Sequence, residues 1–324
     1  MILFLIGAVL ICQQYLSEQY YHNIVPLRKL DDIHAAARSA YNHVRLLASP
    51  AYGGRAPGTD GGKLAAQYIA GQFQKIGLRP AGEQGTYFQT IRSPQFSLVK
   101  DGDRWVPRFS KGLLMTVPSD NVLGYIASPQ AAYPNNTIIL SAHYDHLGQS
   151  GDSYFPGAND NASGIGVMLE VARILASRDR QPRANVLFAA WTSEEEGLYG
   201  SRAFTLKTSV SGVKAVINLD TVGNGDLRAF RIWTQNQDNP LVSIIKEEGA
   251  KQGLHLDTEI LTNGSRHTSD HKVFAEEGIP AVTLLTPTWL DGNHTVQDTP
   301  AIVEPDKLEN AIKLVMAVVD RMAY

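Results

Sequence analysis

Cysteine is almost absent from this chain of 324 residues, in which Cys12 is the single example. One cysteine excludes an internal disulfide framework and any zinc site built from several thiolates. A basic surplus is also missing, because the formal net charge is −3, and this argues against a nucleic-acid-binding protein. No apolar run reaches the roughly 18 residues that a membrane-spanning helix needs. With 44% hydrophobic and 19% charged residues, the composition is typical of a folded globular protein rather than a disordered chain.

The most apolar segment lies at residues 1–12, which read MILFLIGAVLIC. Its length fits the core of a signal peptide, which spans about 7–15 residues. No Lys or Arg precedes the run and no clear small-residue cleavage site follows it, so a strand or helix buried against the fold is the alternative. We predict that residues 1–22 form a signal peptide or N-terminal anchor, with a possible membrane tether through residues 1–12. The protein is then exported, as a periplasmic, secreted or membrane-tethered form.

Apolar residues in the rest of the chain alternate between the spacing of helices and that of strands. Helices are predicted at residues 31–47, 63–76, 162–176 and 269–277, and two more begin at Pro240 and Pro305. Strands are predicted at residues 137–141, 185–191, 213–219 and 281–285, with short strands and loops over 80–120. This order favours an α/β fold with a mixed, mostly parallel central sheet flanked by helices on both faces. The absence of an internal repeat or long linker indicates one domain over residues 23–324.

Acidic residues and histidines follow directly on three of these strands. They are His143, Asp145 and His146 after the first strand, Glu194, Glu195 and Glu196 after the second, and Asp220 after the third. A glycine-bounded loop at 156–164 adds Asp160, and a turn at 291–295 adds His294. In an open α/β sheet such side chains meet in the crevice beyond the carboxyl ends of the strands, where like charges repel unless a cation neutralises them. Each group alone is more often a solvated helix start or a structural histidine, but together they indicate a site for zinc or a similar divalent metal.

Six motifs at these residues, in this order, resemble the di-zinc aminopeptidase family, which includes secreted bacterial leucyl aminopeptidases, glutamate carboxypeptidases and glutaminyl cyclases. The motifs are SAHYDHLG (141–148), GANDNASG (157–164), EEEGLYGS (194–201), NLDTVG (218–223), SDHKVF (269–274) and NHTVQDT (293–299). Three more segments look like the N-terminal part of the family: GGRAPGT (53–59), GLRPAG (77–82) and NVLGYI (121–126). The resemblance implies a zinc exopeptidase-like fold, with a catalytic domain over residues 23–324.

The resemblance implies two Zn²⁺ ions per chain, with other divalent metals as alternatives, and five residues that bind them. These are His143, Asp160, Glu195, Asp220 and His294. By the same resemblance, Asp160 bridges both ions. His143 and Asp220 then complete one site, and Glu195 and His294 complete the other.

Two further carboxylates receive roles from the resemblance. The distance to Gly197 makes Glu194 the general base, and Asp145 orients the imidazole of His143. Two zinc ions carry four positive charges against three negative charges from the ligand carboxylates, and the surplus favours a metal-bound hydroxide. Glu194 takes a proton and passes it to the leaving amine.

The resemblance also implies local geometry around these groups. The peptide bond between Asp160 and Asn161 is expected to be cis. Asp270 and His271 are expected to support the ligands from behind, and helix capping by Ser269 or Asp270 is the alternative.

We therefore expect a metal-dependent aminopeptidase that hydrolyses N-terminal residues of peptide substrates. A glutaminyl cyclase, which works with one zinc ion and does not use the histidine of the first motif as a ligand, is disfavoured by His143. A receptor-like module without metals is disfavoured because all five ligand positions and Glu194 are filled. A glutamate-type carboxypeptidase needs cationic groups for an acidic substrate, and the sequence does not place Arg55, Arg202 or Arg266. The preferred N-terminal residue, the physiological metal and the oligomeric state stay open.

Overall fold

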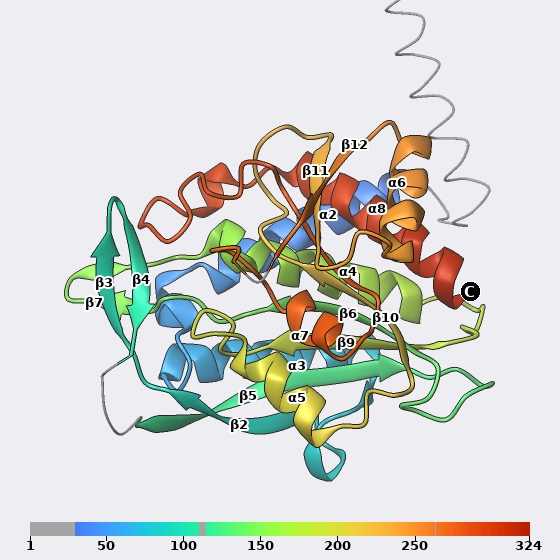
Figure 1. Ribbon diagram of the computed structural model, residues 1–324, viewed down its shortest axis with the longest axis horizontal. Helices are drawn as coiled ribbons and strands as arrows, with labels where there is room; N and C mark the ends of the chain where they lie inside the picture. Colours follow the sequence, from blue (N-terminus) through green and yellow to red (C-terminus); the bar gives the residue numbers. More distant parts are fainter. Residues whose placement is uncertain (1–29, 110–114, 263) are drawn as a thin grey trace, which may run out of the picture.

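The computed structural model describes residues 30–109, 115–262 and 264–324, which are built around a nine-stranded mixed sheet (Figure 1). Its strands are β1 (Arg79–Pro80), β2 (Phe88–Pro94), β5 (Thr116–Ile126), β6 (Thr137–His143), β9 (Asn185–Trp191), β10 (Val213–Leu219), β11 (Ala229–Thr234), β12 (His255–Ile260) and β13 (Ala281–Leu285). The strand order is β1-β5-β9-β6-β10-β13-β11-β12, with β2 paired to β5. The four central strands, β9, β6, β10 and β13, are parallel, and antiparallel β5 and β11 flank them. The predicted mixed sheet is confirmed, with a parallel centre.

Two small hairpins stand apart from this sheet. One pairs β3 (Ser97–Asp101) with β4 (Arg104–Arg108), and the other pairs β7 (Gln149–Ser150) with β8 (Ser153–Tyr154). In Figure 1 the β3–β4 hairpin projects at the left end of the molecule. Arg104 and Trp105 of this hairpin nevertheless reach the candidate site described below.

Helices cover both faces of the sheet, as predicted. One face carries α2 (Leu30–Leu47), α3 (Asp60–Ile76), α4 (Gly164–Ala176), α6 (Pro240–Lys251) and α8 (Pro305–Ala323), and the other carries the shorter α5 (Tyr199–Lys207) and α7 (His271–Glu276). Successive side chains of a strand point to opposite faces. Ile138 and Leu140 of β6 therefore join the larger hydrophobic cluster, and Ile139 joins the smaller one. Burial on both faces explains why the central strands read as continuous apolar runs.

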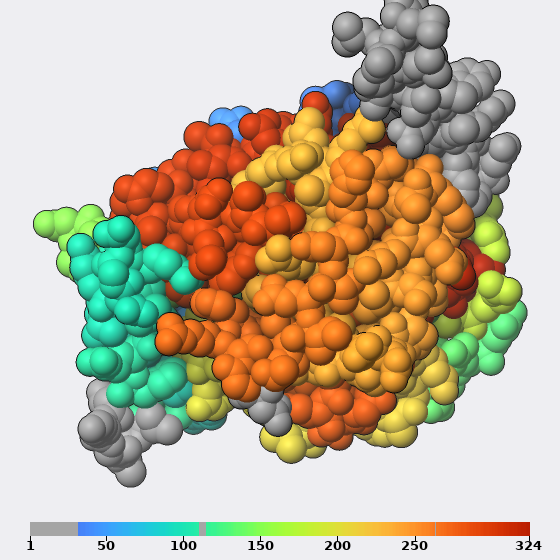
Figure 2. All heavy atoms as spheres, turned by 45° about the horizontal axis from the view of Figure 1, so that its top comes forward, coloured from blue at the N-terminus to red at the C-terminus, as the bar shows by residue number. Residues whose placement is uncertain are grey.

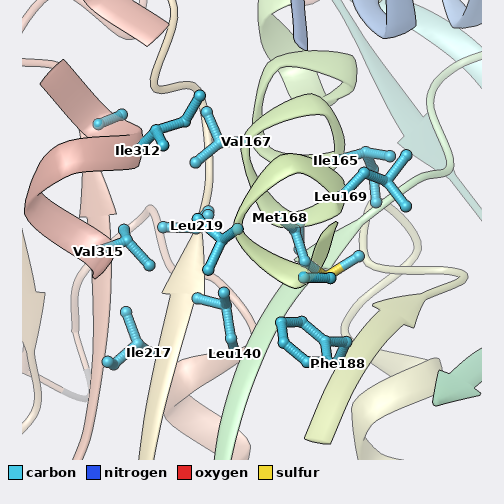
Figure 3. Packing of buried hydrophobic residues seen from close by; sticks show 14 of the residues in the cluster. Leu140, Ile165, Val167, Met168, Leu169, Phe188, Ile217, Leu219, Ile312 and Val315 are labelled. Atoms are coloured by element: carbon cyan, nitrogen blue, oxygen red, sulfur yellow. The ribbon is translucent and has the colours of Figure 1, made fainter. Parts of the chain in front are cut away.

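The centre of the larger cluster is α4, which lies on the sheet beside α8 (Figure 3). Met168 faces Leu140 and Phe188 of the sheet, while Val167 lies on the side of Ile312 in α8. All five side chains are buried, and each such burial contributes about 1.5–3 kcal/mol. This packing holds the strand ends that carry the candidate site in one arrangement.

The predicted strands at 185–191, 213–219 and 281–285 have the same bounds in the structure as β9, β10 and β13. The helix predicted at 63–76 begins earlier, at Asp60, because the Thr59 side chain accepts a hydrogen bond from the Gly62 N–H and caps it. The helix predicted from 162 begins at Gly164, after a wide helical turn, η3 (Ala158–Ser163). Strand β6 continues two residues beyond its prediction, to His143.

The elements that carried no prediction include α5, β11 and β12. Strand β12 lies at the edge of the sheet and is half-buried or exposed along its length, so its sequence lacks a continuous apolar run. Helix α5 buries only Gly200, Ser201 and Phe204, which is too little for a clear apolar stripe.

The predicted signal peptide or anchor at residues 1–22 lies outside the described residues. Among the residues that the structure describes, no helix is both long enough and apolar enough to span a bilayer.

Candidate active site

The carboxyl ends of the parallel strands open into one pocket of about 240 Å³. His143 is the last residue of β6, and the loops after β9, β10 and β13 carry Glu195, Asp220 and His294. Asp160, in the turn η3 before α4, completes the set. All five predicted metal ligands line this pocket, because parallel strands end at the same edge of a sheet.

Asp160 lies between two histidines and turns one carboxylate oxygen toward each. Its Oδ1 is 3.3 Å from Nε2 of His143, and its Oδ2 is 3.3 Å from Nε2 of His294. On one side, Oδ1 of Asp220 lies 3.5 Å from Nε2 of His143. On the other side, Oε2 of Glu195 lies 2.8 Å from Nε2 of His294. The five side chains thus form two donor groups that share Asp160.

The spacing of these donors suits metal binding. Two ligands held at 2.0–2.1 Å by a tetrahedral zinc ion lie about 3.3 Å apart, close to the distances of 3.3, 3.3 and 3.5 Å above. The remaining distance, 2.8 Å between Glu195 and His294, is that of a hydrogen bond. Imidazole nitrogen and carboxylate oxygen are donors that zinc accepts.

The charges of these groups support the same conclusion. Burial opposes ionisation of Asp160, but hydrogen bonds from His143 and His294 hold its pKa well below the usual value. Burial also opposes ionisation of Glu195, yet the charge of His294 lowers the pKa of this carboxyl to about 2. In turn, burial lowers the pKa of His294, but Glu195 outweighs it and raises the pKa to about 10. The buried carboxylates therefore attract positive charge to the position that a metal dication would take.

The loop that carries Asp160 is held from two sides. The carboxylate of Asp298 accepts the backbone N–H of Asn159 at 2.7 Å and that of Asp160 at 3.0 Å. The side-chain amide of Asn293 donates to Oδ2 of Asp160 at 2.6 Å. The peptide bond between Asp160 and Asn161 is cis, as expected. These contacts orient the shared carboxylate between the two histidines.

Each histidine of the two groups is fixed through its other ring nitrogen. His143 donates from Nδ1 to the backbone carbonyl of Asp145 at 3.2 Å. His294 donates from Nδ1 to the backbone carbonyl of Trp105 at 3.0 Å, and the Trp105 N–H returns a bond to the His294 carbonyl. Figure 2 shows the teal hairpin lying against the red-orange segment of the chain that holds His294. Both Nε2 atoms are thereby directed toward Asp160.

Asp145 contacts His143 mainly through its backbone, since its Oδ1 is 3.8 Å from the imidazole Nδ1. Its carboxylate accepts the N–H groups of Glu194 at 3.2 Å and Glu195 at 3.3 Å, and so links the end of β6 to the loop after β9. The Glu194 side chain lies close to His143 and Asp220, with donor atoms of all three within 4.8 Å of one another. Burial raises the pKa of Glu194 well above its usual value, whereas that of its neighbour Glu195 is lowered. Adjacent glutamates therefore have opposite acid–base properties.

His146 is a site residue to which the sequence motifs gave no role. Its Nδ1 lies 2.8 Å from Oε1 of Glu195 and 3.9 Å from Oδ2 of Asp160. Its Nε2 is buried and has no hydrogen-bond partner among the described residues. Its position three residues after His143 in the first motif was the available signal. His146 and His294 both contact Glu195, so either ring is placed to support the second donor group.

The motif at 269–274 supports the site through its first residue. Ser269 donates its hydroxyl to Oδ2 of Asp220 at 2.7 Å. Asp270 is buried and accepts a hydrogen bond from Ser201 at 2.5 Å, and its side chain does not cap α7. His271 is also buried, with Nδ1 bonded to a threonine hydroxyl of β13 at 2.7 Å. Among these three, only Ser269 is hydrogen-bonded to a predicted ligand.

The structure separates the three arginines that the sequence could not place. Arg55 is fully buried, and its guanidinium donates to the backbone carbonyls of Leu47, Tyr144, Pro156 and Gly157. Arg202 is exposed and pairs with Glu276 at 3.2 Å. Arg266 lines the pocket, together with Arg104 from the β3–β4 hairpin.

Residues 121–319 match Peptidase family M28, a segment that includes both donor groups and Glu194. This chain belongs to that family. The contacts of Arg104 and Trp105 with the loop of His294 come from outside the matched segment.

Several known proteins resemble the chain over part or most of its length. Aminopeptidase YwaD of Bacillus subtilis is 31% identical over 215 residues, which are 62% of this chain and 44% of YwaD. A probable zinc metalloprotease of Pyrenophora teres f. teres is 30% identical over 213 residues, 62% of this chain and 40% of that protein. The matches thus span less than half the length of these two relatives.

Solved structures share the fold. BSAP, a zinc aminopeptidase from Bacillus subtilis, has a TM-score of 0.71 at 21% identity, and the superposition covers 89% of this chain and 95% of BSAP. Glutaminyl cyclase of Porphyromonas gingivalis has a TM-score of 0.64 at 22% identity, covering 88% of this chain and 98% of the cyclase. At these identities the likeness shows the fold and does not select between the two activities.

Proposed function

We propose that this member of family M28 is a metal-dependent aminopeptidase that uses two zinc ions to remove N-terminal residues from peptides. The observation that carries the proposal is the position of Asp160, with one oxygen toward His143 and Asp220 and the other toward Glu195 and His294. A carboxylate shared by two donor groups suits a pair of ions rather than a single one. The names of the relatives, an aminopeptidase and a zinc metalloprotease, support this function.

The roles of the remaining residues follow from their positions. When bound, two zinc ions would polarise the scissile carbonyl and activate a water molecule. Glu194 is the proposed general base, which takes a proton from the attacking water and delivers it to the leaving amine. Burial raises the pKa of Glu194, which strengthens this carboxylate as a proton acceptor. Asp145 holds the backbone of Glu194 and so positions this base.

The glutaminyl cyclase alternative shares the fold but receives less support from the site. In this chain His143 belongs to a complete donor group with Asp160 and Asp220, which a single-zinc enzyme would not need. A receptor-like module without metals is equally poorly supported, because such a module gains nothing from several buried carboxylates that face one another without a cation.

One experiment separates these functions. The purified protein is assayed on aminoacyl-arylamides and, in parallel, on a peptide with N-terminal glutamine, while zinc content is measured by mass spectrometry. We expect two zinc ions per chain and release of the arylamine. Cyclisation of the glutaminyl peptide with one zinc ion would support the cyclase instead, and no turnover of either substrate by the zinc-loaded protein would support the non-catalytic module.

We also propose that residues 1–22 direct the protein to export. The apolar run at 1–12 supports this, as does a relative named vacuolar membrane protease from Candida albicans, 28% identical over 267 residues. Fractionation of cells that express the full chain, or a chain without residues 1–22, tests it. We expect only the full chain outside the cytosol, and equal distributions would contradict the proposal.

A further inference from the structure

The charged residues that line the pocket are unevenly distributed. Its carboxylates, among the described residues, are the four that face the two donor groups: Asp160, Glu194, Glu195 and Asp220. Two guanidinium groups, of Arg104 and Arg266, line the same pocket. Two zinc ions would neutralise the four carboxylates, and the arginines would then leave the pocket positively charged. A basic side chain of the substrate would find no carboxylate here beyond the proposed metal ligands and the proposed base Glu194, whereas an acidic one would find a guanidinium.

The two arginines differ in their availability. Arg104 is engaged, because it donates from Nε to the backbone carbonyl of Asn293 at 3.2 Å, and its guanidinium lies 5.8 Å from the centre of the Trp289 ring. Arg266 is exposed and makes no hydrogen bond or ion pair with any part of the chain that the structure describes. Of the two arginines that line the pocket, Arg266 is thus the one without a partner among the described residues.

The loop that carries Arg266 is held against the pocket wall. The ring of the next residue, His267, packs edge-on against Trp289 with 4.8 Å between ring centres. Trp289 in turn packs against the buried Trp233, with 5.2 Å between ring centres. Burial, followed by the charges of Arg104 and Arg266, lowers the pKa of His267, in keeping with a positive local potential. Arg266 is therefore presented at the pocket by a packed aromatic wall.

We propose that Arg266 binds a carboxylate of the substrate close to the scissile bond, so that the enzyme prefers acidic or very short peptides. A guanidinium presents paired N–H donors that match the geometry of a carboxylate. The carboxylate has two possible sources: the side chain of an N-terminal Asp or Glu, or the free C-terminus of a dipeptide. This inference rests on the proposed aminopeptidase function and names its substrate class.

Two pairs of substrates that differ only in charge test the proposal. Glutamyl- and glutaminyl-arylamide compare an acidic with a neutral N-terminal side chain. A dipeptide and its C-terminal amide compare a charged with a neutral C-terminus. Each is assayed with the zinc-loaded wild type, with Arg266→Gln and with Arg202→Gln, which removes an exposed arginine of α5 outside the pocket. Binding of free glutamate and glutamine to the three proteins is measured by calorimetry as a readout independent of turnover. Because Arg266 is exposed and unpaired, its replacement leaves the fold intact.

In at least one pair, we expect the substrate with the extra carboxylate to have about a tenfold higher kcat/KM than its neutral partner. One charge-assisted hydrogen bond contributes a difference of this size. Arg266→Gln should abolish that preference mainly through KM, and Arg202→Gln should keep it. The pair that responds identifies the source of the carboxylate. Equal rates within both pairs, or a preference that survives Arg266→Gln, would overturn the role of Arg266. If the zinc-loaded wild type hydrolyses none of these substrates, the proposed aminopeptidase function is overturned instead, so the two failures are distinguishable.

Discussion

Asp160 faces a histidine on each side, at 3.3 Å from both, so a change in its charge acts on both donor groups. Asp160→Asn removes one negative charge and one anionic donor from each group. We expect zinc content to fall well below two per chain and kcat/KM to drop by more than the 10–100-fold that loss of an outer hydrogen-bond partner typically costs. Metal analysis and arylamide kinetics measure this. The control is Asp257→Asn, which changes an exposed carboxylate paired with Arg231 and should keep the zinc content and kcat/KM of the wild type. Two bound zinc ions with near-normal turnover in Asp160→Asn would exclude Asp160 from the site.

Glu194 and Glu195 are neighbours whose pKa values are shifted in opposite directions. Glu194→Gln should retain both zinc ions and lower kcat by about 10²–10⁴, the usual contribution of a positioned general base. Glu195→Gln should lower zinc occupancy as well as rate, because Glu195 is the proposed ligand beside His294. Each variant serves as the control for the other. Loss of zinc in Glu194→Gln with retention in Glu195→Gln would show that the two roles are reversed.

At the scale of single elements, α8 carries an unusual buried charge. Lys307, in its first turn, is fully buried and donates to the backbone carbonyls of Asp226 and Ala229. Its Nζ lies 3.7 Å from the centre of the Phe230 ring. Burial lowers the pKa of Lys307 to about 8. The amine therefore ties α8 to the segment before β11 at the cost of holding a charge away from water.

This position predicts a pH dependence of stability. Between pH 8 and the ordinary lysine pKa of about 10.4, the unfolded chain binds a proton at Lys307 that the folded chain does not, so the free energy of unfolding rises with pH. Lys307→Met removes this contribution. Urea unfolding of both proteins at pH 7 and pH 10.5 should show the stability difference, wild type minus variant, grow by about 3 kcal/mol. A difference that is the same at both pH values would mean that the folded protein does not disfavour the charged amine.

At the scale of the whole molecule, the donor groups join segments that are far apart in the chain. His143 ends β6, Asp160 precedes α4, and Glu195, Asp220 and His294 follow three further strands. An ion that binds only the folded protein stabilises it by about 2.7 kcal/mol at a hundred times its dissociation constant. We therefore expect metal binding at this place to stabilise the fold as a whole.

Metal removal tests this coupling. Dialysis against a chelator should lower Tm by about 5–10 °C, and added zinc should restore it. The Asp160→Asn protein is the control, since its Tm should change little with either treatment. An unchanged Tm in a wild type shown to have lost its metal would contradict the coupling between the site and the fold.

Patterns confined to short stretches of chain are determined by the sequence itself. The strands at 185–191, 213–219 and 281–285 are buried on both faces, so their apolar runs mark their bounds. The cluster of acidic residues and histidines could be located because each follows a strand or lies in a turn, and the resemblance to the di-zinc aminopeptidase family selected the five ligand candidates within it. Edge strand β12 and helix α5 could not be predicted from the sequence. Much of their surface is exposed, so their apolar residues show no strong helical or strand periodicity.

Contacts between distant residues were decided by the tertiary structure alone. Asp298 holds the backbone of Asp160 from 138 positions away, and the carbonyl of Trp105 orients His294 across 189 positions. Each of these hydrogen bonds joins a side chain to a backbone group. Because backbone groups have the same chemistry at every residue, no local sequence pattern predicts such a bond. The arginines show the same limit. Arg55 and Arg266 are chemically identical, and only the packing around them makes one a buried brace for four carbonyls and the other an exposed cation at the pocket.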